Sequence, residues 1–191
     1  MLRRHSANSC AGTIGDARTG PCEVAIDAPV LNVLSTGSIG GASKGGIVHA
    51  GNIVGSIVNA GTIIGSNTGI AFHRGATLTG GLTNSGLIAG GTSAVYVDPN
   101  ASLDRIVIAG NNTAAFVGAV VAPKTMVTVA GGAVYTLSSN FQVATFSNEG
   151  TLIVTPAVTP TITGNLAFQN SGIFMPTVNT STSYATLNVT G

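Results

Sequence analysis

Charged side chains are scarce in this sequence. Asp, Glu, Lys and Arg make up 7% of its 191 residues, whereas an ordinary soluble domain carries about a quarter. The formal net charge is +1, and the seven basic residues are scattered along the chain. This distribution offers no electrostatic surface for nucleic acid, so we expect no nucleic-acid partner.

Helix-forming residues and long apolar runs are also missing. Lys, Glu and Gln are nearly absent, so long amphipathic helices are not expected. The longest strongly apolar run, residues 114–122, is interrupted by Gly118 and is far shorter than the ~18 to 20 residues of a spanning helix. We therefore expect no direct insertion into a membrane. The opening MLRRHSANSC turns polar where a signal peptide needs an apolar segment, which predicts that this chain has no signal peptide.

Cysteine is nearly absent as well, with Cys10 and Cys22 as the two examples. A disulfide between them would require an oxidising compartment and would stabilise the fold by roughly 3 kcal/mol. Two ordinary thiols are the equally weighted alternative. Two cysteines and the nearby His5 supply too few ligands, at no recognised spacing, for a metal site. We expect no metal and no cofactor.

What the chain does contain is a repeat. The repeat is rich in glycine, and the whole chain has 27 glycines. Sliding the sequence against itself by 25 positions matches a full unit, with apolar residues on apolar residues and glycine on glycine. The matched pairs include Asn59 with Asn84, Gly61 with Gly86, Ile63 with Ile88, Ile70 with Val95, Phe72 with Val97, Leu78 with Leu103, and Leu82 with Val107. The chain therefore repeats one structural unit.

A second pair of units has a shift of 22, which places Phe146 on Phe168 and Asn148 on Asn170. All four units share the motif N-x-G-x-[ILF]. Its asparagines are Asn59, Asn84, Asn148 and Asn170, and its glycines are Gly61, Gly86, Gly150 and Gly172. We interpret the glycines as corners. We interpret the asparagines as a structural ladder, since Asn tolerates left-handed backbone angles and its amide can bond the equivalent residue one unit away.

The period of the repeat decides between β architectures. Short alternating runs such as residues 94–97 and 126–129 indicate strands. Propeller blades need about 40 residues, whereas 20 to 25 residues fit one coil of a solenoid. We expect an all-β fold, a right-handed parallel β-helix of about six to seven rungs over residues 35–191. Residues 1–34 are predicted to be a cap or poorly ordered, and residues 112–140 to form rungs of different turn shape.

Carboxylates are too few to suggest an enzyme readily. The best constellation is His73 with Asp98, which should lie on neighbouring rungs and have Arg74 and Asp104 close in sequence. Such a pair could orient an imidazole as a base, but no serine is marked as a nucleophile. Both residues precede turns, which favours a weak surface pair on an exposed corner. We therefore expect no catalysis.

The motifs VNAGTIIGSNTGIAF, TNSGLIAGGTSAVYV, SNEGTLIV and QNSGIFM, with the ending STSYATLNVTG, resemble rungs of autotransporter passenger domains. These are β-helical rods that Gram-negative bacteria export through an outer-membrane barrel. The resemblance covers about 155 residues. Neither the family's barrel nor its signal peptide is recognisable, so we expect a fragment that could not export itself.

The resemblance implies a structural or adhesive rod, at the cell surface or extracellular in the full-length protein. It would bind host surfaces, glycans or sister rods, or present a distal domain. Exposed terminal rungs would allow self-association. The alternative function is a β-solenoid enzyme that degrades polysaccharides, a hydrolase or lyase with a groove on one face.

Overall fold

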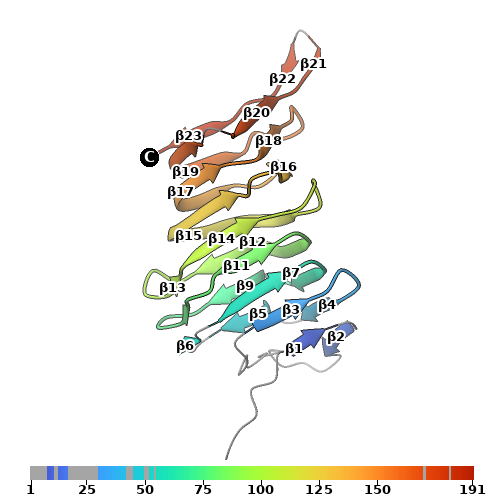
Figure 1. The fold of residues 1–191 in the computed structure, drawn as a ribbon, viewed down its shortest axis with the longest axis vertical. Helices are drawn as coiled ribbons and strands as arrows, with labels where there is room; N and C mark the ends of the chain where they lie inside the picture. Colours follow the sequence, from blue (N-terminus) through green and yellow to red (C-terminus); the bar gives the residue numbers. More distant parts are fainter. Residues whose placement is uncertain are drawn as a thin grey trace, which may run out of the picture.

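The computed structural model describes residues 8–10, 13–16, 30–41, 45–49, 52–53, 55–169, 171–180 and 182–191. Within these ranges there are strands and no helix, and the strands wind into a β-solenoid of about six turns. Successive coils lie above one another along the long axis of the molecule (Figure 1). The all-β parallel solenoid expected from the 25-residue repeat is therefore confirmed.

Each coil passes along three faces, which we number in chain order. The first face contains one parallel strand segment from each coil. Its members are β1 (Asn8–Cys10), β3 (Val30–Val33), β7 (Ser56–Asn59), β11 (Leu82–Asn84), β14 (Arg105–Ile108) and the ends of β15 (Ala115–Val129), β17 (Phe141–Asn148) and β19 (Thr161–Phe168).

The second and third faces are parallel as well. The second face contains β2 (Thr13–Asp16), β4 (Ser38–Gly41), β8 (Thr62–Gly65) and the starts of β12 (Leu87–Val97) and β15. The third face contains β5 (Gly45–His49), β9 (Thr68–Phe72), the end of β12, the middle of β15, the starts of β17 and β19, and β23 (Asn188–Thr190).

Two smaller parallel sheets complete the coils. β6 (Asn52–Ile53), β10 (Thr77–Leu78) and β13 (Ser102–Leu103) form one, and β16 (Val134–Thr136), β18 (Thr151–Val154) and β20 (Ile173–Pro176) form another. β21 (Val178–Thr180) and β22 (Ser183–Tyr184) pair antiparallel, unlike the other strands described. This hairpin projects beyond the coils at the C-terminal end (Figure 1).

The core consists of apolar columns that run the length of the rod. Ile63 pairs with Ile88, as the repeat predicts, and both are fully buried. The first-face column is Leu31, Ile57, Leu82, Ile106, Val127, Phe146 and Leu166. The third-face column is Ile47, Ile70, Val95, Val120, Phe141, Ile162 and Val189. Stacking equivalent apolar side chains removes them from water and stabilises each coil against its neighbours.

The coil length varies more than the sequence alignment predicts. The offset is 25 residues between Thr83 and Val58, falls to 19 between Met126 and Thr145, and rises to 27 between Thr161 and Asn188. The middle coils are shorter because the two-residue strands of the β6, β10 and β13 sheet have no successor there. The last coil is longer because the β21–β22 hairpin is inserted. These changes explain why the repeat blurs after residue 112.

Two predicted matches are therefore wrong in register. Leu82 pairs with Ile106 rather than with Val107, because this coil is one residue shorter. Asn148 pairs with Phe168 rather than with Asn170, because the corner between β19 and β20 is two residues longer than the corner between β17 and β18. Asn170 itself lies outside the described residues.

The corner motif works differently from the prediction. Among the described residues, Asn112 is the non-glycine residue with positive φ, at 57°, so Asn59, Asn84 and Asn148 do not adopt the left-handed angles that Asn tolerates. The motif glycines have ordinary φ as well. They are required because a Cβ would collide with backbone of the coil below; at Gly86 it would meet the carbonyl oxygen of Gly61. Close approach between coils, rather than an unusual dihedral angle, excludes side chains there.

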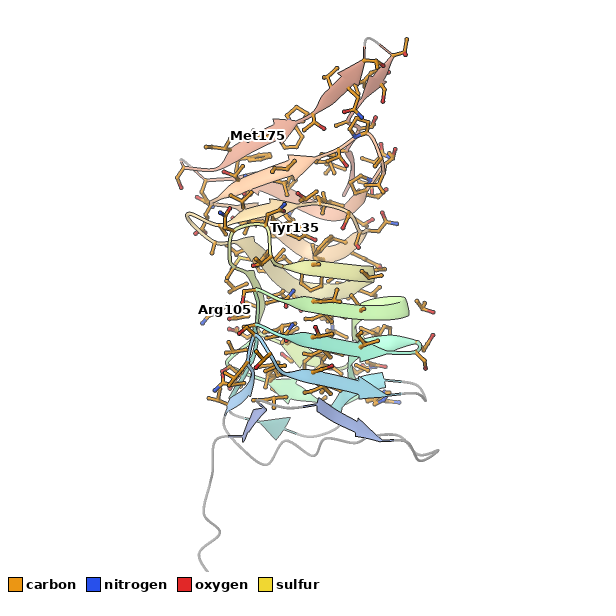
Figure 2. The ribbon with its side chains drawn as sticks, turned by 90° about the vertical axis from the view of Figure 1, so that its right-hand side faces the viewer. Arg105, Tyr135 and Met175 are labelled. Carbon is orange, nitrogen blue, oxygen red and sulfur yellow. The ribbon has the colours of Figure 1, made fainter. Side chains whose placement is uncertain are left out.

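Aromatic residues fill the core of the shorter coils. Phe141 makes edge-to-face contacts with Phe116 at 5.7 Å and with Phe146 at 5.1 Å between ring centroids. Tyr135 joins this cluster, 6.3 Å from Phe116. Figure 2 shows Tyr135 between the stacked strands, whereas Arg105 lies at the outside. Large rings replace the volume that the lost corner strands would have filled.

Candidate functional site

Polar residues inside the corner between the first and second faces form the best-defined cluster. Asn59 and Asn84 are fully buried at the ends of β7 and β11. The Asn59 Nδ2 donates to the Asn84 Oδ1 at 2.8 Å and to the Leu87 carbonyl at 3.1 Å. Each Oδ1 also accepts from the motif glycine two residues later, Gly61 at 3.2 Å and Gly86 at 3.3 Å. These amides satisfy corner backbone groups that would otherwise be buried unpaired.

The third asparagine stands apart from this pair. Asn148 is three coils above Asn84, and the intervening first-face positions are Ile108 and Val129. Its Nδ2 donates to the Ile173 carbonyl at 2.9 Å, whereas its buried Oδ1 has no hydrogen-bond partner. The four predicted asparagines are therefore not one continuous ladder in the described residues. The interruption has a simple cause, since two coils place an apolar residue at this position.

The predicted His73–Asp98 pair lies on one corner of the rod. The Asp98 amide donates to the Phe72 carbonyl at 2.9 Å, so the two turns are adjacent coils as predicted. The Asp98 carboxylate, however, accepts from the backbone and side-chain nitrogens of Asn100, at 2.8 and 3.3 Å, within its own turn. His73 and its neighbour Arg74 are exposed. The Asp98 carboxylate therefore stabilises its own turn rather than orienting the His73 imidazole.

Lys124 extends this charged corner by one further coil. Its Nζ donates to the Pro99 carbonyl at 2.6 Å, across 25 positions in the sequence. Sequence reasoning missed this contact, although the same 25-residue offset that linked His73 to Asp98 would have located it. The corner therefore presents His73 and Arg74, then Asp98, then Lys124, on three successive coils.

A shallow depression lies on the outside of the first face. Its volume is about 350 Å³. Its lining residues are Gly80, Leu82, Thr83, Arg105, Val107, Met126, Thr128, Ala130 and Glu149. Glu149 is the one carboxylate in this lining, whereas acid–base cleavage of a glycosidic bond generally uses two.

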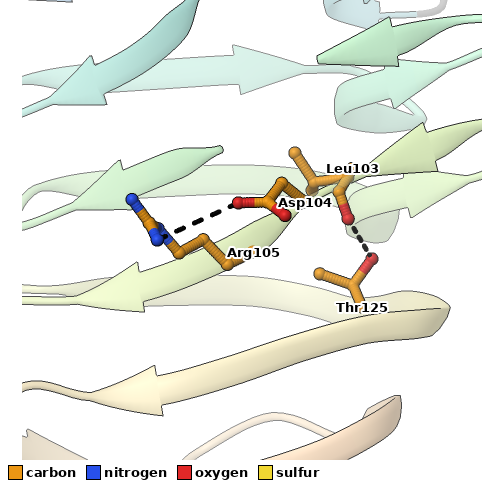
Figure 3. Close-up of polar contacts among 4 residues, drawn as sticks. All are labelled: Leu103, Asp104, Arg105 and Thr125. Carbon is orange, nitrogen blue, oxygen red and sulfur yellow. Dashed lines mark hydrogen bonds and ion pairs between the residues drawn. The ribbon is translucent and has the colours of Figure 1, made fainter. Parts of the chain in front are cut away.

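Arg105, which lines this depression, forms only a weak ion pair. Arg105 lies 3.9 Å from the Asp104 carboxylate, and both side chains are about half exposed, at 55% and 53% (Figure 3). An exposed pair of this kind contributes little to stability. The same close-up shows a stronger structural contact, in which the buried Thr125 hydroxyl donates to the Leu103 carbonyl at 3.1 Å. Thr125 thus stabilises the corner between the third-face and first-face parts of β15, where this coil has no strand equivalent to β13.

The remaining sequence-based candidates are only partly described. Cys22 and His5 lie outside the described residues, and of Cys10 only the backbone in β1 is described, so the disulfide stays a prediction. Within the described ranges, no three His, Cys, Asp or Glu side chains gather as metal ligands. In the same ranges no helix has the length and apolar character needed to cross a membrane.

Comparison of the chain with protein-family models, with curated proteins and with solved structures gave no match.

Proposed function

We propose that this chain is the stalk of a surface-displayed, autotransporter-like protein, a rod that holds a distal part away from the cell and offers its sides for adhesion. The observation that carries the proposal is the continuous core. An apolar column runs through seven successive coils on the first face, from Leu31 to Leu166. A core of this shape stabilises length along a single axis, which is the mechanical property a stalk needs.

The outer surface supports an adhesive role. Uncharged polar side chains occupy the corner between the second and third faces, where the Thr92 hydroxyl donates to the Asn67 side chain at 2.8 Å. Both residues are exposed. Repeated hydroxyl and amide groups with little charge around them suit the weak hydrogen bonds that glycans or other uncharged surfaces offer. The proposed partners are host surfaces, glycans or sister rods.

The adhesive proposal is tested with the full chain coupled to beads. We expect the beads to adhere to immobilised glycans or to epithelial cells more than beads coated with an unrelated β protein do. Asn67→Lys together with Thr92→Lys should reduce adhesion, whereas Gln142→Lys, an exposed position on the third face, should not. Equal adhesion of all three proteins and the unrelated control would contradict the proposal.

The competing function, a polysaccharide-degrading enzyme, is favoured by one observation, the depression with Glu149 and Arg105 on the first face. A screen of polysaccharides for new reducing ends, or for the ultraviolet absorbance of unsaturated sugars, tests it. Activity that Glu149→Gln abolishes would replace the stalk proposal with an enzyme. We expect no turnover.

A further inference from the structure

The depression on the first face has four polar side chains in its lining, those of Thr83, Arg105, Thr128 and Glu149. None of the four is buried. In the part of the chain that the structure describes, none of these side chains makes a hydrogen bond. The Arg105 guanidinium has one contact, with the Asp104 carboxylate at 3.9 Å, which is too long for a hydrogen bond. The donors and acceptors of the lining are therefore available to a ligand.

These polar groups lie around an aliphatic floor. Thr83, Val107 and Thr128 are paired in register on β11, β14 and β15, so they form one column on the outside of the first face. Met126 lies in the neighbouring column, next to Arg105, and is 46% exposed. Hydroxyl groups therefore alternate with aliphatic side chains across successive coils of the depression.

The two charged groups lie at opposite ends of the depression. Arg105 begins β14 and pairs with Met126, which pairs in turn with Thr145 on the next coil. Glu149 follows Thr145 by four positions. Glu149 is therefore about 13 Å further along the strands and about 10 Å further along the rod than Arg105, a separation of about 16 Å. Figure 2 shows Arg105 at the outside of the rod. A ligand that reaches both groups must be elongated.

The charges of the lining favour a neutral ligand. Arg105 and Glu149 carry one charge of each sign. A ligand with a net charge would be attracted by one of them and repelled by the other. The Asp104 carboxylate beside Arg105 disfavours an anion further. A neutral ligand that both accepts and donates hydrogen bonds suits the guanidinium, which only donates, and the carboxylate, which only accepts.

An oligosaccharide suits this surface better than a neutral peptide does. The strands beneath the depression are paired with the coils on either side, so they offer no free edge to a peptide backbone. The depression is also shallow, whereas a peptide usually anchors a large side chain in a pocket. Sugar hydroxyls donate and accept, and the C–H faces of sugar rings can contact Val107 and Met126.

We propose that the depression binds a neutral oligosaccharide, whose hydroxyls accept from Arg105 at one end and donate to Glu149 at the other. The middle of the oligosaccharide covers Val107. The ligand is held rather than cleaved, because the lining has one carboxylate and hydrolysis generally uses two. This site is separate from the corner of Asn67 and Thr92, and it does not depend on the stalk function.

The test is an NMR titration of the full chain with cellohexaose, xylohexaose and mannohexaose as neutral probes. Hexagalacturonate and a glycine–serine peptide blocked at both ends are the acidic and the peptide probes. We expect at least one neutral hexasaccharide to bind with a Kd of about 1 mM or lower. The acidic probe and the peptide should bind at least about tenfold more weakly.

Arg105→Met removes the guanidinium donors and keeps an apolar side chain, and Thr128→Val removes one hydroxyl at nearly constant shape. Each should raise the Kd about fivefold or more, because a hydrogen bond to the ligand is lost. Arg74→Met, which changes an exposed arginine on another corner, is the matched control and should leave the Kd unchanged. Asn67→Lys with Thr92→Lys should leave it unchanged as well, so oligosaccharide binding and adhesion at that corner can fail separately.

Far-UV circular dichroism and a thermal melt of each variant separate loss of binding from loss of folding, and two variants on different coils protect the test against one that misfolds. A chain that binds none of the neutral hexasaccharides would overturn the proposal. Tighter binding of hexagalacturonate or of the peptide would overturn it too. The same holds for an unchanged Kd in both Arg105→Met and Thr128→Val, or for shortened hexasaccharides after incubation with the chain.

Discussion

At the scale of single residues, the Tyr135 hydroxyl is one of three buried side-chain polar atoms without a hydrogen-bond partner in the described part of the chain, beside the Ser147 hydroxyl and the Asn148 Oδ1. It is fully buried and finds no hydrogen-bond partner among the described residues. An orphaned hydroxyl loses its hydration without compensation. Tyr135→Phe keeps the ring contacts and should raise the free energy of unfolding by about 1 kcal/mol, measured by urea denaturation. Tyr184→Phe, at an exposed position, is the control and should change nothing. A destabilised Tyr135→Phe would mean that the hydroxyl has a partner, such as a buried water.

Burial also makes Tyr135 sensitive to alkali. Desolvation raises the pKa of its hydroxyl well above the ordinary value of 10.0. The unfolded chain therefore loses this proton at a lower pH than the folded chain does. As the pH rises above about 10, the native state binds more protons than the unfolded state, so stability falls, by at most about 1.4 kcal/mol per pH unit. We expect Tyr135→Phe to show a smaller loss of stability between about pH 10 and pH 11 than the unmodified chain. Identical alkaline profiles would contradict this assignment.

The Asn84 side chain differs from the Tyr135 hydroxyl, because both its Oδ1 and its Nδ2 have hydrogen-bond partners. Its Oδ1 accepts from Asn59, and its Nδ2 lies 3.4 Å from the Ala115 carbonyl. Asn84→Leu would leave the Asn59 amide and corner backbone groups without these partners. We expect a loss of about 1 to 3 kcal/mol in the free energy of unfolding. Asn165→Leu, at an exposed strand position, should stay within about 0.5 kcal/mol. No difference between the two variants in a thermal melt would argue against the asparagine pair.

At the scale of elements, the corners decide how closely coils can stack. A Cβ on Gly86 would meet backbone atoms of Ala60 and Gly61, whereas a Cβ on Gly40 would have open space. Gly86→Ala should therefore destabilise the fold by about 2 kcal/mol or more, since two coils would have to separate. Gly40→Ala should be neutral or stabilising by up to about 1 kcal/mol, because it restricts the unfolded chain. Equal melting temperatures for the two variants would mean that the corner can adjust without cost.

The sequence predicted those elements that repeat strictly. The pairing of Ile63 with Ile88 follows from like residues at a fixed offset, because a solenoid stacks equivalent positions. The pairing of Asn148 could not be predicted in the same way, since two extra corner residues shift the register without altering the motif. Turn length is decided by backbone geometry that several short sequences can satisfy.

The candidate site was predictable only in outline. The 25-residue offset placed Asp98 next to the turn of His73, and this adjacency is observed. It could not show that the Asp98 carboxylate bonds Asn100, because side-chain direction within a turn depends on local dihedral angles. The orphaned Tyr135 hydroxyl was equally hidden, since a missing partner is a property of the packed core.

At the scale of the whole molecule, stability rests on the apolar columns and on backbone pairing between coils. Charges contribute little, because they are few, and the ion pair at Asp104 and Arg105 is half exposed. Salt screens exposed charges but leaves buried apolar contacts largely unaffected. We therefore expect the melting temperature to differ by no more than about 2 °C between about 0.02 M and 0.5 M sodium chloride. Sodium sulfate should raise it, because sulfate strengthens apolar burial. A large fall in the melting temperature at the higher sodium chloride concentration would show that charge pairs hold the rod together.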